Sequence, residues 1–254
     1  MFTLVGWSQS IDSAVLAAIT AIPDPHVRVQ GNDVIVPGAQ PNSPPLNALV
    51  GAFGIGVNIT RLQMQSPSLR RILFNEIAPV SIGILPPTVP AWNDMRFAPP
   101  ILDPEEALDA FIAESGAGAT RNSAFAWLAD QPIEPVKGDI RTVRVTATTT
   151  LTAFQWSNAQ LTFDQSLPAG RYQIVGGRME SAGLLAWRCV IVGGLWRPGA
   201  IGYATAGLVE PSAFRQGNMG VWGEFNHNTP PTIDYLSGSA DTAEAGELDL
   251  IKVA

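Results

Sequence analysis

The chain has 254 residues, of which 46% are hydrophobic and 15% are charged, against about 25% charged in an average soluble domain. This balance argues against a disordered chain, which would be rich in charge and poor in apolar residues. The 24 glycines and 21 prolines interrupt helices often and argue against an all-α protein. The length allows one large domain or two of ordinary size.

The charged residues limit the classes of partner. The net charge is −7, and the 15 basic residues are 13 arginines and two lysines, Lys137 and Lys252. The longest basic run is Arg70-Arg71, whereas nucleic-acid binding depends on clustered cations that release phosphate counterions. We therefore expect no sequence-specific nucleic-acid partner. Arginine is enriched and lysine depleted at protein–protein interfaces, so this composition favours a surface that binds other chains, although a GC-rich genome would produce the same bias.

Residues 11–22 of the N-terminal half carry apolar side chains at helical spacing. With Ser10 as N-cap and Pro23 after its end, this segment predicts an amphipathic helix of about three turns. A helix so short is marginal in water, so we expect tertiary contacts, a neighbouring subunit or a lipid surface to hold it. On this hypothesis Ile19→Asp would disturb assembly more than folding.

The rest of the N-terminal half mixes strands with short helices. Gly31-Asn32, between two short apolar segments, predicts a β-hairpin. Residues 103–115, DPEEALDAFIAES, predict a short helix with acids in its first turn, or alternatively a strand. The remaining predictions are one or two strands over 48–65 with Ile59 and Leu62 facing the core, a short helix over 67–76 capped by Ser66, extended segments over 78–86 and 95–102, and a strand within 121–136.

The C-terminal half predicts about eight short strands separated by Gly, Pro, Asn and Asp turns. In the first of them, Val143, Val145 and Ala147 alternate with polar residues, as in a strand with one buried face. Close, regular strand spacing is typical of a sandwich or barrel and not of a βαβ fold. The predicted strands lie within 140–152, 159–164, 171–180, 184–194, 199–205, 220–225, 232–240 and 247–253.

The change in sequence character near IEPVKGD, residues 133–139, marks a domain boundary. We predict an N-terminal β-sandwich with its helix over residues 1–137 and a C-terminal β-sandwich over residues 138–254. The N-terminus lacks the features of a secretory signal, and no apolar stretch reaches the roughly 18 residues of a membrane-spanning helix. We therefore expect a soluble protein made in a cytoplasm.

Few residues of the chain suggest chemistry. Cys189 lies in an apolar strand-like run and is expected to be a core residue, and His227 is expected to be a loop residue. GAFGIGVN (51–58) lacks the third glycine of a dinucleotide-binding motif, and ADTAEAG (240–246) has Ala243 where the aspartic-protease triplet has glycine. We predict no catalytic, cofactor-binding or metal-binding residues, and a protein that is not an enzyme.

Other polar and aromatic residues also have structural explanations. Asp103, Glu105 and Glu106 fit the first turn of a helix better than a general-acid site. The tryptophans fit core or interface positions better than a sugar site. The chain has seven of them, at positions 7, 92, 127, 156, 187, 196 and 222.

With two β-rich halves, the chain resembles the double jelly-roll major capsid proteins of tailless icosahedral viruses of bacteria. The resemblance covers the whole chain in architecture and is strongest in the C-terminal half. The segments that carry it run from GDIRTVRVTATTTL through LPAGRYQIVGGRM, LWRPGAIGYA and GVWGEF to LDLIKV.

The resemblance implies that both jelly rolls stand upright, side by side, in trimers of pseudo-hexagonal outline that tile a virus shell. It further implies location in the virion, contacts with a minor capsid protein or an inner membrane, and an N-terminal helix on the inner side. Two alternatives stay open. One is a carbohydrate-binding, lectin-like sandwich that uses Trp156, Trp196 or Trp222 as a stacking platform, and the other is a glycoside-processing enzyme with a carboxylate pair.

Overall fold

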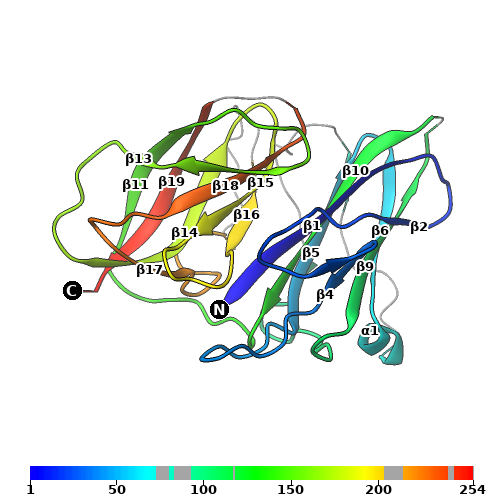
Figure 1. Ribbon diagram of the computed structural model, residues 1–254, viewed down its shortest axis with the longest axis horizontal. Coiled ribbons are helices and arrows are strands. Elements are labelled where there is room, and N and C mark those ends of the chain that lie inside the picture. The colour runs from blue at the N-terminus through cyan, green and yellow to red at the C-terminus, as the bar shows by residue number, and fades with distance from the viewer. Residues whose placement is uncertain (73–79, 83–92, 117, 203–213, 240–242, 254) are drawn as a thin grey trace. The chain divides into compact units, whose positions relative to one another are not determined.

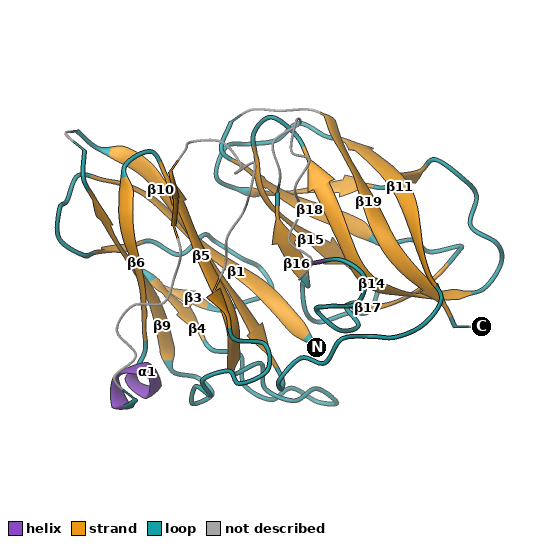
Figure 2. Cartoon of the chain, turned by 180° about the vertical axis from the view of Figure 1, so that it is seen from behind, coloured by secondary structure: helices purple, strands orange, loops and turns teal. Residues whose placement is uncertain are grey.

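The computed structural model describes residues 1–72, 80–82, 93–116, 118–202, 214–239 and 243–253. Within these residues the chain is mainly β, with mostly antiparallel sheets and a single short α-helix (Figures 1 and 2). It divides into two compact units, the first built from Phe2–Ile84 and Ala91–Pro132 and the second mainly from Ile133–Ala254. The prediction of a mainly β chain is confirmed, and the sheets of each unit are consistent with a β-sandwich.

Two sheets form the first unit. In one, β10 (Thr120–Ala129) lies between β1 (Phe2–Ile11) and β5 (Ala48–Gly56), and β5 also pairs with β7 (Val80–Ile82) and β8 (Asn93–Asp94). In the other, β9 (Ala107–Glu114) pairs with β2 (Ala17–Ile19) and β4 (Asp33–Ile35) on one side and with β6 (Ile59–Gln65) on the other. β3 (Val29–Gln30) pairs with β4, and α1 (Pro67–Arg71) follows β6.

The second unit also contains two sheets. The first has the order β13-β11-β19-β14-β17, and the second has the order β12-β18-β15-β16. Their strands are β11 (Ile140–Thr148), β12 (Trp156–Gln160), β13 (Thr162–Phe163), β14 (Arg171–Glu180), β15 (Leu184–Val190), β16 (Gly199–Ile201), β17 (Gly223–Asn226), β18 (Thr232–Ser237) and β19 (Ala243–Lys252). Each of the eight predicted strand segments of this half therefore overlaps a strand, whereas most of β12 lies outside the predicted segments.

The two units share part of their strand order, although β3, β4 and the parallel strand β7 of the first unit have no counterpart in the second. The order β1-β10-β5 in the first unit corresponds to β11-β19-β14 in the second, and β2-β9-β6 corresponds to β12-β18-β15. In both units the first and last long strands are neighbours, and a strand from the middle of the unit pairs with the last one.

Alternation along the strands explains how the sheets bury their apolar side chains. In β11, Val143, Val145 and Ala147 are buried, whereas Arg144 and Thr148 are exposed, as the sequence predicts. The two sheets of the second unit meet through such side chains: the hydroxyl of Tyr235 on β18 lies 3.8 Å from the Met179 sulfur on β14. The central strand β5 of the first unit is buried along its whole length, which explains its run of small and apolar residues.

The prediction of a helix over residues 11–22 is wrong. Ile11 ends β1, a ten-residue strand paired with β10 along its length, and residues 17–19 form β2. The backbone N–H of Ile22 donates to the Gly6 carbonyl, and the N–H of Ser8 donates to the Thr20 carbonyl. These hydrogen bonds join residues far apart in the sequence, so sheet pairing outcompetes local helical spacing in a segment rich in β-branched residues.

The helical prediction for 103–115 is also wrong, and its alternative, a strand, is confirmed. β9 buries Leu108, Ala110 and Ile112 with the period of two that a strand requires. The acids before it bind elsewhere: Glu106 Oε2 accepts hydrogen bonds from the backbone N–H (3.2 Å) and the hydroxyl (3.0 Å) of Ser68, in the first turn of α1. Glu106 therefore stabilises the start of α1 and not of its own segment, whereas Asp103 and Glu105 form ion pairs with Arg71 and Arg28.

Other local predictions are confirmed. The hairpin of β3 and β4 turns at Gly31, whose φ of 65° is in the left-handed region that glycine adopts readily. Ser66 caps α1 by accepting a hydrogen bond from the Leu69 N–H, and Ile59 and Leu62 of β6 are buried. Residues 78–86 include β7, and the rest of that segment lies outside the described residues. The prediction of an extended segment over 95–102 is not confirmed, because these residues begin with a turn and contain only an isolated bridge from Ile101 to Ala48.

The position of Ile19 yields a prediction about folding. Its side chain is 0% exposed in β2, so Ile19→Asp would bury a carboxylate. An uncompensated buried charge lowers the free energy of unfolding by about 3–5 kcal/mol. We expect this loss in denaturant unfolding followed by circular dichroism. Val15→Asp is the matched control, because Val15 is 71% exposed and surface substitutions change stability by about 0.5 kcal/mol or less. Equal stability of the two variants would contradict a core position for Ile19.

Candidate functional site

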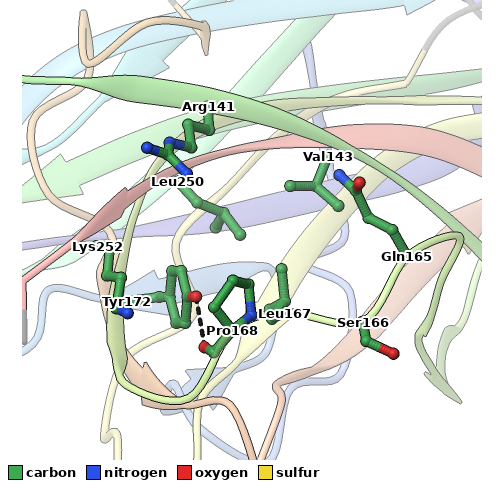
Figure 3. A pocket seen from close by; sticks show the side chains of 9 residues that line it. All are labelled: Arg141, Val143, Gln165, Ser166, Leu167, Pro168, Tyr172, Leu250 and Lys252. Atoms are coloured by element: carbon green, nitrogen blue, oxygen red, sulfur yellow. Dashed lines mark hydrogen bonds between the residues drawn. The ribbon is translucent and has the colours of Figure 1, made fainter.

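A pocket in the second unit opens where three neighbouring strands have their ends. β11 and β14 begin there and β19 ends there, with Arg141 opposite Leu250 and Tyr172 opposite Lys252 in the two ladders. The cavity has a volume of about 210 Å³. It is lined by Arg141, Val143, Gln165, Ser166, Leu167, Pro168, Tyr172, Leu250 and Lys252 (Figure 3).

The floor of the pocket is apolar because it is the end of the core. Val143 and Leu250 lie on the face of the sheet that also carries the buried side chains of Val145 and Leu248. Both of these floor residues and Tyr172 are buried. A ligand that entered the pocket would therefore meet alkyl and aromatic groups at its base.

The wall of the pocket is the connection between β13 and β14. The Tyr172 hydroxyl donates a hydrogen bond of 2.6 Å to the Pro168 carbonyl oxygen (Figure 3). The Tyr172 ring also stacks on Phe225, with 5.7 Å between the centroids. Beyond Pro168, the Nδ1 atom of His227 accepts a hydrogen bond of 3.2 Å from the Gly170 N–H, so His227 is a loop residue that supports this connection. The wall is thereby held in place before any ligand binds.

The rim of the pocket is positively charged. Arg141 and Lys252 are both exposed, and no carboxylate is among the residues that line the cavity. Arg141 forms an ion pair of 3.3 Å with Asp139, whose side chain is 84% exposed, and such surface pairs contribute little. Within the described part of the chain, Lys252 forms no salt bridge. An apolar floor below two cations suits a small molecule with an anionic head and an apolar tail.

A second polar cluster lies on the opposite face of the same sheet. Arg215 donates hydrogen bonds to Asp249 (3.2 and 3.3 Å), to Glu247 (2.9 Å) and to the Thr142 hydroxyl (3.2 Å). The backbone at Phe214 and Arg215, which we call the Arg215 segment, crosses the sheet at Gly176. A Cβ atom on Gly176 would lie 2.7 Å from the Arg215 Cα. Glycine at this position allows the segment to approach, and the guanidinium group then fixes it across β11 and β19.

Asp249 is the carboxylate most affected by this cluster. Burial alone would raise its pKa, but hydrogen bonds from Arg215, Thr142 and the Gln216 N–H outweigh burial and hold the pKa below its ordinary value. Asp249 therefore stays charged in the folded protein and holds the Arg215 segment on the sheet.

Comparison with models of protein families, with curated proteins and with solved structures found no match to this chain.

The tryptophans that were candidates for a sugar platform are largely covered. Trp196 and Trp222 are buried, and Trp222 packs against Trp187 with 5.3 Å between the ring centroids. Trp156 is partly exposed, but the guanidinium carbon of Arg188 lies 3.7 Å from its ring centroid. These positions match the core role that the sequence predicts for most tryptophans. Trp92 lies outside the described residues.

The other residues singled out in the sequence are placed as follows. Cys189 is fully buried in β15, where burial, and to a smaller extent the charge of Asp234, raises the pKa of its thiol well above the ordinary value. Asp241 of the ADTAEAG segment lies outside the described residues. Among the described residues, no three His, Cys, Asp or Glu side chains are grouped as a metal site would require.

Sequence reasoning found neither the pocket nor the Arg215 cluster. Arg141 and Lys252 are 111 positions apart in the sequence, and only the pairing of β11 with β19 brings their strand ends together. LPAGRY (167–172) indicated a turn but not the wall of a cavity. One available signal was that Lys252, one of only two lysines, comes directly after the apolar residues Leu250 and Ile251 near the end of a predicted strand.

The Arg215 cluster yields a prediction about pH. Because the pKa of Asp249 is lower in the folded protein, the stabilising effect of this carboxylate is complete above the unfolded-state pKa of about 3.9. The effect is lost as the pH falls through the lower folded-state pKa. Asp249→Asn should lower the free energy of unfolding by about 1.5–3 kcal/mol at pH 7. It should also flatten the decline in stability as the pH falls below about 4, measured by urea unfolding.

Asp164→Asn is the control for the loss of one negative charge in the same unit, because Asp164 is half exposed in a 3.5 Å ion pair with Arg144. We expect it to follow the wild-type profile. A decline for Asp249→Asn as steep as that of the wild type would show that Asp249 does not contribute to acid sensitivity.

Proposed function

We propose that the chain is a structural protein, a double jelly-roll capsid protein whose trimers tile an icosahedral virus shell. The observation that carries this proposal is the part of the strand order that the two units share, in which β1-β10-β5 corresponds to β11-β19-β14 and β2-β9-β6 corresponds to β12-β18-β15. In this proposal the main partner is the chain itself. Minor capsid proteins or an inner membrane are further contacts, the location is the virion, and the protein catalyses no reaction.

The pairing in the second unit supports the jelly-roll assignment. A jelly roll is an eight-stranded hairpin, with strands 1-8, 2-7, 3-6 and 4-5 paired, rolled into two sheets. With β13 set aside as an addition, these pairs correspond to β11-β19, β12-β18, β14-β17 and β15-β16. The rolled pairs 8-3 and 7-4 correspond to β19-β14 and β18-β15.

The first unit supports the same assignment in its longer strands. There the pairs 1-8, 2-7, 8-3 and 7-4 correspond to β1-β10, β2-β9, β10-β5 and β9-β6. β8 pairs antiparallel with β5, in the place of the sixth strand. Two such rolls in one chain fit the family that the sequence resembles.

The trimer follows from the number of rolls. Three chains supply six similar sandwiches, so a threefold ring has a nearly sixfold outline, which tiles a surface with few types of contact. Such a ring needs a heterologous contact, in which the flank of one chain meets a different flank of the next. A chain with thirteen arginines, of which Arg96, Arg188 and Arg197 are buried, and two lysines suits this arrangement, because interfaces favour arginine over lysine.

The proposal predicts the mass of the protein in solution. Sedimentation and light scattering near neutral pH and moderate salt should show about three chains per particle, or much larger shells. Electron micrographs of the same sample should show pseudo-hexagonal particles or closed shells. A stable trimer of this kind buries at least about 1,600 Å² at each interface, so it should persist on dilution to micromolar concentration.

The control measurement addresses the lectin-like alternative, because jelly rolls also occur in lectins. The same preparation is passed over immobilised sugars and eluted with free sugar. A monomer at all concentrations that is retained on a sugar resin would overturn the capsid proposal. A trimer that passes through unretained would support it.

A further inference from the structure

The pocket at the end of the second unit combines three features that together define a ligand class. Its floor is apolar, its rim carries Arg141 and Lys252, and none of its lining residues is acidic. The chain as a whole has a net charge of −7 and only two lysines, so one lysine and one arginine at one cavity make a local positive site on an acidic protein. A concave site lined by one sign of charge attracts ligands of the opposite sign.

The volume limits the size of the ligand. The cavity of about 210 Å³ is smaller than the roughly 300–1,000 Å³ of pockets for drug-sized ligands. It therefore suits a tail of a few methylene groups, not a long lipid chain. The hydrogen bond from Tyr172 to Pro168 holds the wall in place, so little conformational freedom is lost when a ligand enters.

We propose that this pocket binds a short-chain aliphatic carboxylate, a free fatty acid of about six to eight carbons. The carboxylate lies at the rim, where the guanidinium of Arg141 and the ammonium of Lys252 donate hydrogen bonds to it. The alkyl tail lies against Val143, Leu250 and Leu167. This binding is separate from the proposed assembly, because the site is built from one unit of one chain.

The test is isothermal titration calorimetry of the full-length protein with sodium octanoate, below the concentration at which octanoate forms micelles. Hexanoate tests the tail: each buried methylene contributes about 0.8 kcal/mol, so octanoate should bind about tenfold more tightly than hexanoate. Octylammonium, with the same tail and the opposite charge, tests the rim and should bind at least tenfold more weakly than octanoate. No octanoate binding, or equal binding of octanoate and octylammonium, would overturn the proposal.

Substitutions of residues that line the pocket test whether octanoate binds there. Arg141→Gln and Lys252→Gln should each weaken octanoate binding about fivefold, because each removes one charge-assisted hydrogen bond at a partly solvated rim. Leu167→Ser should reduce the advantage of octanoate over hexanoate, since Leu167 lines the wall and is not part of the fully buried core. A thermal melt of each variant shows that it remains folded.

Arg144→Gln is the matched control. Arg144 is on the same strand as Arg141 but three positions along, on the opposite face of the sheet, and it does not line the cavity. It should bind octanoate within twofold of the wild type. A loss equal to that of Arg141→Gln would show that general charge, and not this pocket, attracts the ligand. Binding by a protein that proves monomeric would support the pocket while overturning the capsid proposal, so the two results are independent.

Discussion

The antiparallel pairing between the first and last long strands of each unit is the constraint on which the remaining structure depends. β1 pairs with β10 over ten residues, and β11 pairs with β19 over nine. Each ladder joins segments about a hundred residues apart, and closing so long a loop is costly until the ladder forms. Once β19 is in place between β11 and β14, the core residues Leu248 and Leu250 are buried on the inner face of the sheet, and Asp249 lies on its outer face.

The two faces of this sheet then serve different purposes. The inner face carries the core and ends in the pocket beside Arg141 and Lys252. The outer face holds the Arg215 segment, which is fixed by Asp249 and allowed to approach by Gly176. A buried carboxylate is costly unless hydrogen bonds satisfy it, and Asp249 has donors from a side chain, a hydroxyl and the backbone. The outer cluster is therefore a structural clamp, whereas the pocket remains open to a ligand.

Most of the second unit could be predicted from its sequence, because its strands alternate buried and exposed residues and its turns contain Gly and Pro. Val143, Val145 and Ala147 show this pattern directly. The first unit was harder to predict. Residues 11–22 have helical spacing and residues 103–115 have a helix-like acidic start, yet both contribute strands, since partners distant in the sequence complete their hydrogen bonds. The local residue pattern indicates which secondary structure a segment prefers, but it does not indicate which strand the segment pairs with.

The sequence alone determined that the chain is β-rich, that Cys189 is a core residue and that Ser66 caps a helix, because composition, alternation and capping act over a few residues. Tertiary structure decided which strands are neighbours, and with them the pocket and the Arg215 cluster. Arg141 and Lys252 meet at one rim only because β11 and β19 pair in one register, and a shift of that register by one residue would place their side chains on opposite faces of the sheet. Contacts between distant residues depend on the whole fold, which no local pattern records.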